Sequence, residues 1–281
     1  MRRLIINADD FGLTAGVNRA VAELNAAGLL PSTTLMARAR ATDEAIAMAL
    51  TAPSLGVGCH VVLVDGEPVL PAEKVASLVD PRTGRLYQAL GTFLWRLFTG
   101  RLRAAEIEAE AAAQIAALQN RGLRLTHFDT HKHTHMFPLV LKPLLRAAHD
   151  AGISAVRNPF EPVWAMRATP RAPLARRGEE MVLRFFEPAL RRIIAKEGFA
   201  TTDGTIAIVG TGSLDASMVR SLLSQLPEGT WELVTHPGYN DADLARVDTR
   251  LRASREVEMQ ALRAVVEFAD VELISFAGLR G

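Results

Sequence analysis

Short runs of apolar and β-branched residues alternate along the chain with longer stretches rich in Ala, Leu, Arg and Glu. Short apolar runs are typical of buried β-strands, and the longer stretches are typical of amphipathic helices. The runs predict strands over Arg3–Ala8, Thr33–Ala37, Val57–Val62, Leu125–Thr130, Ser154–Arg157, Thr205–Val209, Trp231–Thr235 and Glu272–Phe276. The longer stretches predict helices over about 14–28, 42–51, 104–121, 138–151, 175–197, 214–226 and 251–268.

The alternation of strands and helices indicates the fold class. Strands that alternate with helices favour a mainly parallel sheet. Seven or eight such units in 281 residues predict an α/β fold in which 1–281 forms a single closed or nearly closed (β/α) barrel. An open doubly wound sheet is the alternative. Two Pro-containing segments, about 63–103 and 158–175, break the pattern, and we predict that both are long inserted loops.

Composition and charge exclude several classes of protein. The chain is 49% hydrophobic and 22% charged, as in ordinary globular proteins. Its 32 basic and 31 acidic side chains give a formal net charge of +1, which does not favour a nucleic-acid partner. No apolar run approaches the roughly 18 residues of a membrane span, and acids follow the first apolar run too soon for a signal peptide. With a single cysteine, Cys59, we expect a cytoplasmic protein.

Polar residues lie within or directly after five of the predicted strands. In both α/β architectures, ligands bind at the carboxyl ends of the strands, so these residues are expected at one rim. The segments concerned are Asn7–Gly12, Gly58–His60, His127–His135, Arg157–Pro159 and Thr235–Gly238. Imidazole and carboxylate groups from several strands suit Zn²⁺, or another divalent ion such as Mn²⁺ or Mg²⁺. The sequence therefore predicts a metal-assisted active site.

The histidine-rich segment carries the strongest part of this prediction. Its polar residues alternate, so they share one face if the chain is extended there. The residues are His127, Asp129, His131, His133 and His135. Five groups are too many for one ion, so some of them are expected to support the ligands or to face the substrate. The alternative is a solvent-exposed loop that happens to be rich in histidine.

The other candidate residues also have two interpretations each. Asp9 and Asp10 can both turn into the barrel mouth at a strand end, or one of them can cap the next helix. His60 is either a ligand or a hydrogen-bonded core residue. His236 is either a general acid, since histidine titrates near neutral pH, or a turn residue. Arg157 either orients an acid or the substrate, or forms a surface salt bridge.

Together these motifs resemble the YdjC-like (chitooligosaccharide deacetylase) family. The matching segments run in the family's order along nearly the whole chain: Asn7–Gly12, Ser32–Thr34, Gly58–His60, His127–Pro138 and His236–Gly238. Cys59 stands where the family usually has an apolar residue. The resemblance implies a distorted (β/α) barrel related to polysaccharide deacetylases. It also implies hydrolysis of an N-acetyl group from an amino sugar with one divalent metal ion.

The resemblance also implies roles for individual residues. His60 and His131 would be metal ligands, together with one acid of the Asp9–Asp10 pair. By analogy with the related deacetylases we assign Asp9 as the base and Asp10 as the ligand, although the two roles are open to exchange. Independently of the resemblance, the titration of histidine near neutral pH leads us to assign His236 to protonate the leaving amine. The remaining candidates, assigned to substrate binding, are Asp129, His133, His135 and Arg157.

A narrower resemblance concerns the substrate. The segment Val62–Pro71 resembles the branch of the family that is associated with hopanoid biosynthesis. That branch implies an N-acetylglucosaminyl bacteriohopane polyol, a membrane lipid, as the substrate. Aromatic residues and arginines are interspersed in 92–103 and 182–194, a pattern that suits helices lying on a bilayer. We therefore expect peripheral contact with the inner membrane; ordinary amphipathic helices packed on the barrel are the alternative.

Three other functions remain open at this point. The chain could be a chitooligosaccharide deacetylase acting on soluble sugars. It could be a metal-dependent phosphoesterase, which would use a similar set of acids and histidines but usually needs two metal ions. It could also be a non-catalytic protein that binds a sugar lipid. Neither a monomer nor a homodimer is favoured by the sequence.

Overall fold

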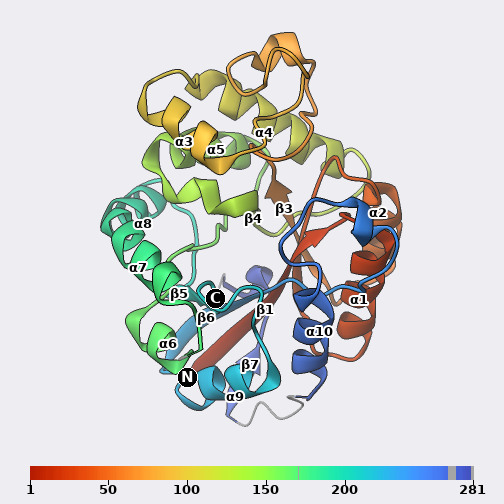
Figure 1. Cartoon of the computed structure of the whole chain (residues 1–281), viewed down its shortest axis with the longest axis vertical. Coiled ribbons are helices and arrows are strands. Elements are labelled where there is room, and N and C mark those ends of the chain that lie inside the picture. Colours follow the sequence, from red (N-terminus) through yellow and green to blue (C-terminus); the bar gives the residue numbers. More distant parts are fainter. Residues whose placement is uncertain (170, 265–269, 280–281) are drawn as a thin grey trace.

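The computed structural model describes residues 1–281 except 170, 265–269 and 280–281. At its centre lies a curled sheet of parallel strands (Figure 1). The strands run in the order β4-β3-β2-β1-β6-β5, and β7 pairs with the first residues of β1. Their bounds are β1 Arg2–Phe11, β2 Ser32–Leu35, β3 Gly56–Val61, β4 Phe128–Thr130, β5 Gly204–Ile206, β6 Gly229–Thr235 and β7 Val271–Leu273. The sheet confirms the predicted α/β class and its distorted barrel.

The segment predicted as a strand over Ser154–Arg157 forms only isolated bridges. Phe128 in β4 pairs with Val156, and Ala155 pairs with Ala200, both in parallel. The amide of Val156 donates to the carbonyl of Ala200 at 3.0 Å. Pro159 follows closely and cannot donate to a ladder, which explains why the pairing stops. These bridges nevertheless connect β4, at one edge of the sheet, to the chain that leads into β5. Backbone hydrogen bonds therefore link the two edges of the curled sheet on that side.

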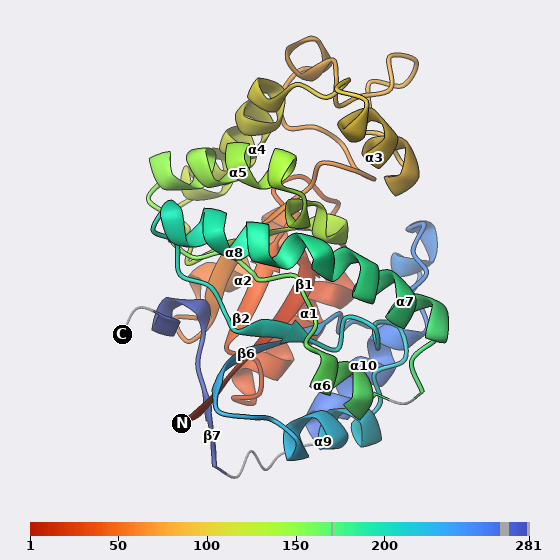
Figure 2. The same ribbon diagram turned by 90° about the vertical axis from the view of Figure 1, so that its left-hand side faces the viewer.

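Ten helices in the described residues flank the sheet (Figures 1 and 2). In Figure 1, α1, α2 and α10 cover one side of the sheet, α7 and α8 the other, and α3, α4 and α5 lie together at the top. Their bounds are α1 Ala15–Ala26, α2 Thr42–Leu50, α3 Leu90–Phe98, α4 Ala104–Gln119, α5 Pro138–Asp150, α6 Val163–Ala168, α7 Leu174–Leu183, α8 Glu187–Lys196, α9 Ala216–Ser224 and α10 Ser254–Ala264. No helix in these ranges is long and apolar enough to cross a membrane.

Two of the predicted helices have different limits in the structure. The helix expected over 175–197 is divided into α7 and α8 by a 3-10 turn at Arg184–Phe186. Pro188 lies in the first turn of α8, where its missing N–H costs nothing, so the proline starts a new helix instead of continuing the old one. The helix expected over 251–268 is described as α10, and its last predicted residues lie outside the described ranges.

The segment 63–103, expected to be a loop, contains a 3-10 turn at Ala72–Val75 and helix α3. One face of α4 holds it in place. Glu110 accepts the amides of Val69 and Leu70 at 2.7 and 3.1 Å, and Glu106 accepts the amide of Ser77 at 2.7 Å. The segment 158–175 likewise contains α6. Both segments therefore include helices.

The barrel interior is polar at one end and apolar at the other. Side chains alternate along β1, so Leu4, Ile6 and Ala8 pack in the main apolar core. Ile5, one residue out of phase, packs instead with Ala155 and Phe276 in a separate small cluster. The next residues in phase with Ile5 are Asn7 and Asp9, whose side chains are hydrogen-bonded to each other. The interior thus passes from an apolar plug to polar groups at the carboxyl ends of the strands.

Candidate metal centre and acid–base site

The adjacent acids Asp9 and Asp10 both reach the site because β1 is irregular at this point. Strand alternation alone would send them to opposite faces. The register between β1 and β2 shifts between Ala8 and Phe11, and Asp10 has a positive φ of 64°. An irregularity of this kind re-aims a side chain, so both acids turn into the barrel mouth.

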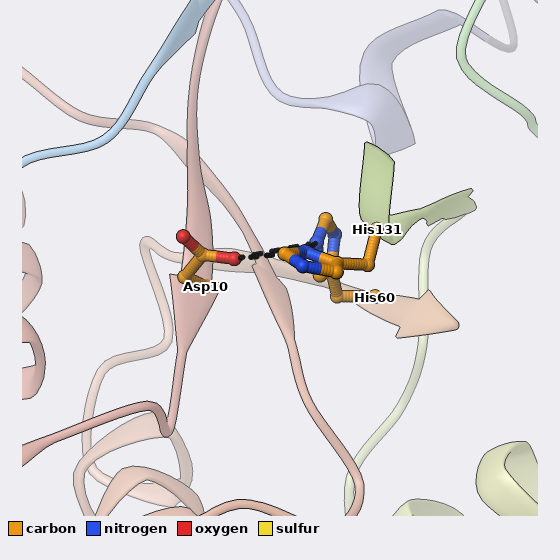
Figure 3. A group of neighbouring side chains, drawn as sticks. All are labelled: Asp10, His60 and His131. Atoms are coloured by element: carbon orange, nitrogen blue, oxygen red, sulfur yellow. Dashed lines mark hydrogen bonds and ion pairs between the residues drawn. The ribbon is translucent and has the colours of Figure 1, made fainter. Parts of the chain in front are cut away.

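Asp10, His60 and His131 bring three ligand atoms together at the end of the sheet (Figure 3). Asp10 Oδ1 lies 3.5 Å from His60 Nε2 and 3.4 Å from His131 Nδ1. The two imidazole nitrogens are 3.3 Å apart. Ligands about 2.0–2.1 Å from a tetrahedral ion are separated by about 3.4 Å, so the three atoms form one face of such a site.

The surroundings of His60 also suit a metal ligand. Its Nδ1 donates to Asp129 Oδ1 at 2.8 Å, which leaves Nε2 directed toward Asp10 and His131. Metal-binding histidines are commonly oriented by a carboxylate in this way. Burial lowers the pKa of His60, but the charges of Asp129, Asp10 and Asp9 raise it to about 10. Such an excess of negative charge favours a divalent cation, so the residues present fit one.

Arg157 is completely buried beneath Asp9. Its Nη1 and Nη2 donate to the two carboxylate oxygens of Asp9 at 2.8 and 2.6 Å. Nε and Nη2 donate to Glu232 at 2.8 and 2.6 Å, and Nη1 also pairs with Asp129. Burial raises the pKa of Asp9, but Arg157 with His60 and His236 holds it well below its usual range. Arg157 is therefore not a surface salt bridge, and it keeps Asp9 ionised.

A second set of potential ligands, Asp9, His60 and Asp129, lies next to the first and shares His60 with it. Two of its three members are already bound by the guanidinium of Arg157. The guanidinium therefore already compensates the charge of these two carboxylates. In the first set Asp10 Oδ1 remains directed at the two imidazole nitrogens, so Asp10, His60 and His131 are the candidate ligands for a single metal ion.

His236 lies on the other side of Asp9, with Nε2 3.9 Å from Asp9 Oδ2. Its backbone amide donates to Glu258 Oε2 at 2.7 Å, and its Nδ1 is 3.7 Å from the same oxygen. Burial lowers the pKa of His236, but Glu258, Asp9 and Asp10 outweigh it and raise the pKa above its usual value. His236 therefore lies beside Asp9 with its pKa raised by the surrounding acids.

The histidine-rich segment is not extended, so the expected shared face is wrong beyond the strand. β4 ends at Thr130, and His131–Met136 forms a 3-10 turn in which Lys132 and His133 have positive φ values of 56° and 52°. Thr130 stabilises the turn, because its hydroxyl accepts the amide of His135 at 3.1 Å and bonds its Nδ1 at 2.7 Å. His131 alone of the turn joins the ligand group.

The remaining histidines of this segment lie in different surroundings. His135 is completely buried behind the turn, and its ring lies 6.3 Å from that of His133. Burial and the charge of Arg157 lower the pKa of His133 to about 3, so its imidazole is neutral. His127 lies deeper and stacks on Phe276 at 3.8 Å. A Cβ at Gly58 would lie 2.5 Å from the His127 ring, so only glycine leaves room for it.

Four residues of the site were missed by the sequence analysis. Thr34 Oγ1 contacts Asp9, His60 and Asp129 within 3.4 Å, and its Ser-Thr-Thr motif was the only available signal. Burial raises the pKa of Glu232 to about 7, although the charge of Arg157 lowers it. Arg255 and Glu258 come from α10, where nothing in the sequence separates them from the charged residues of any surface helix.

The fold and this geometry define an α/β barrel with a candidate metal centre, and Asp9 and His236 lie beside it at the carboxyl ends of the strands. The model of the YdjC-like protein family matches residues 3–267, and the chain belongs to that family. A carbohydrate deacetylase from Thermoanaerobacter pseudethanolicus is 30% identical over 93% of this chain and 91% of its own length. One from Brevibacillus brevis is 28% identical over 99% of both chains.

Solved structures of two proteins share the fold. A candidate cellobiose-phosphate cleavage protein from Enterococcus faecalis superposes with a TM-score of 0.76, covering 99% of this chain and 98% of its own, at 24% identity. A lactam utilization protein from Thermus thermophilus gives a TM-score of 0.55 at 15% identity, covering 97% and 99%. At these identities the likeness concerns the fold alone.

Proposed function

We propose that this protein is a metal-dependent hydrolase that removes the N-acetyl group from an amino sugar. The observation that carries the proposal is the arrangement of Asp10, His60 and His131 as one face of a metal site, with Asp9 and His236 beside it. The relatives named carbohydrate deacetylases support this choice of reaction.

In this proposal each side chain has one task in amide hydrolysis. A divalent ion held by Asp10, His60 and His131 supplies Lewis acidity. Asp9, kept ionised by Arg157, accepts the proton of the attacking water at its carboxylate. His236 donates its proton to the nitrogen of the leaving amino sugar, and Glu258 holds its backbone in place. The products are acetate and the free amine.

Among the alternatives, a two-metal phosphoesterase is disfavoured by Arg157. Two-metal sites hold their ions about 3.5–4 Å apart between shared ligands. Here the second set of acids binds a guanidinium that is completely buried. Metal analysis of the purified protein checks this, with one ion per chain expected and two ions per chain supporting the phosphoesterase.

Acetate release tests the reaction and its substrate together. We propose a lipid-linked amino sugar, of the N-acetylglucosaminyl bacteriohopane polyol class, as the natural substrate. We expect faster acetate release from that lipid than from diacetylated chitobiose, and loss of activity when a chelator removes the ion. Preference for chitobiose would favour a chitooligosaccharide deacetylase. No release from either substrate, with metal bound, would favour a binding protein.

A lipid-linked substrate would be met at a membrane surface, and one face of the protein suits that surface. The rings of Phe98 and Phe186 both contact the ring of Phe137. Their centroids lie 5.4 Å and 5.3 Å, respectively, from the centroid of Phe137. Phe137 directly follows the 3-10 turn His131–Met136, so this aromatic group is joined to the turn that carries His131. Val182 and Phe185 are 72% and 83% exposed beside it. Segments 92–103 and 182–194 therefore meet at this aromatic group.

The charge on these two segments favours an anionic bilayer. The segment 92–103 contains three arginines and no acid, and 182–194 contains three arginines and one glutamate. They therefore carry net charges of +3 and +2 in a chain whose total is +1. Basic residues near exposed apolar side chains are what anionic lipid surfaces attract.

Replacing Val182 and Phe185 together with serine is expected to weaken binding to anionic vesicles about tenfold or more, because each substitution removes apolar area that the bilayer would otherwise bury. Activity on soluble chitobiose should not change, because neither side chain touches the site. Cosedimentation with vesicles measures the effect, and Leu50→Ser, at a 54% exposed position on α2, is the matched control. Wild-type protein that stays in the supernatant would contradict membrane contact and leave the deacetylase proposal standing.

A further inference from the structure

Arg255, near the start of α10, is buried against the carboxylate of Asp10. Its Nη2 donates to Asp10 Oδ2 at 2.5 Å, and the whole residue is only 1% exposed. Its Nε and Nη1 have no hydrogen-bond partner among the described residues. Removing a guanidinium from water is unfavourable, and this one is compensated by a single partner. Because burying this guanidinium is unfavourable, we ask what its contact does for Asp10.

The surrounding chain is shaped to admit this side chain. A Cβ at Gly238 would lie 3.1 Å from Arg255 Cδ, so the glycine of the His-Pro-Gly segment makes room for the arginine. One helical turn after Arg255, Glu258 reaches the amide of His236 on the same side of α10. The face of α10 turned to the barrel therefore carries one contact to each side of the site.

The contact with Arg255 gives the two carboxylate oxygens of Asp10 different partners. Oδ2 is bound to Arg255, whereas Oδ1 faces His60 and His131 at 3.5 and 3.4 Å. The backbone of Asp10 is left-handed, a conformation that is strained for a non-glycine residue and that the surroundings must maintain. We infer that Arg255 is a positioning residue that fixes the carboxylate of Asp10 so that only Oδ1 is presented to the metal ion.

This inference rests on the metal site of the proposed function, and two opposite effects decide its outcome. The positive charge of Arg255 repels a cation bound at Oδ1, so removing that charge alone would tighten metal binding. Loss of the contact also frees the carboxylate to rotate, which weakens binding. Supporting contacts of this kind typically contribute about 10–100-fold to metal affinity, so orientation is expected to dominate.

Titration of the metal-free full chain with Co²⁺, followed by visible absorption, measures both affinity and ligand geometry. Arg255→Met is expected to bind Co²⁺ about 10–100-fold more weakly, with an altered spectrum. Arg255→Lys keeps the buried charge but offers a less directed donor, so it should fall between wild type and Arg255→Met. The matched control is Arg263→Met, also on α10, whose side chain pairs with Glu23 at the surface. It should bind Co²⁺ like wild type.

Unchanged or tighter Co²⁺ binding by the folded Arg255→Met protein would overturn the inference. If that protein does not fold, Arg255→Lys decides the question in the same way, because wild-type affinity and spectrum in it would also overturn the inference. The variant His131→Gln distinguishes an error in the role inferred for Arg255 from an error in the proposed metal centre. Wild type that binds no Co²⁺, or His131→Gln that binds it equally well, would contradict the proposed metal centre.

Discussion

Asp9→Asn is expected to lower kcat by about 10²–10⁴-fold while the metal ion stays bound, which is the range that removal of a general base typically costs. Asparagine has nearly the same shape as aspartate but cannot accept the proton of the attacking water. The proposed ligands Asp10, His60 and His131 are not changed by the substitution, so the ion has no reason to leave. Acetate release and metal content, measured on the same preparation, test both parts.

Two controls make this result specific to the base. Asp9 also binds Arg157 at 2.8 and 2.6 Å, so thermal unfolding must show that the variant is folded. Asp10→Asn should lose the ion as well as activity, which distinguishes a ligand from a base. Full turnover by Asp9→Asn with metal bound would refute the assignment. Loss of the ion from Asp9→Asn but not from Asp10→Asn would exchange the two roles.

The parts of the fold that could be predicted are those with a strong local pattern. The apolar run before Asp9 produced β1, and the run before His236 produced β6, within three residues at each end. His60 and His131 could be expected at one rim because parallel strands end on the same side. The cap of α1 is Thr14 and not an acid of the Asp9–Asp10 pair, since Thr14 Oγ1 accepts the amide of Val17 at 3.3 Å.

What could not be predicted depends on contacts between distant parts of the chain. Arg157 pairs with Asp9 across 148 positions and Arg255 with Asp10 across 245, and no spacing in the sequence signals either pair. The left-handed backbone at Lys132 was also hidden, because that conformation is usual only for glycine and asparagine-like residues. Alternation of polar residues therefore indicated an extended segment where the chain turns.

Arg157→Met is expected to destabilise the protein by about 3–5 kcal/mol at neutral pH, the usual consequence of removing one partner from a buried ion pair, since it leaves uncompensated charge in the interior. Here three carboxylates, those of Asp9, Asp129 and Glu232, would lose the cation they share. Urea unfolding of chelator-treated protein measures the loss without any contribution from metal binding. Arg263→Met, which breaks an exposed pair, should cost less than about 1 kcal/mol.

The loss in Arg157→Met should depend on pH in a defined direction. With Arg157 present, the pKa of Asp9 is held well below its usual range, so this pair stabilises the wild type above the unfolded pKa near about 4. Without it, burial raises the pKa of Asp9 and Glu232, and the variant loses stability as the pH rises through about 4–7. The free energies of unfolding of the two proteins should therefore become similar at acidic pH.

Adding Glu232→Gln, which removes one of the three acids, should restore part of the stability at about pH 7. A loss that is the same at about pH 4.5 and about pH 7 would show that Arg157 contributes packing and not charge compensation.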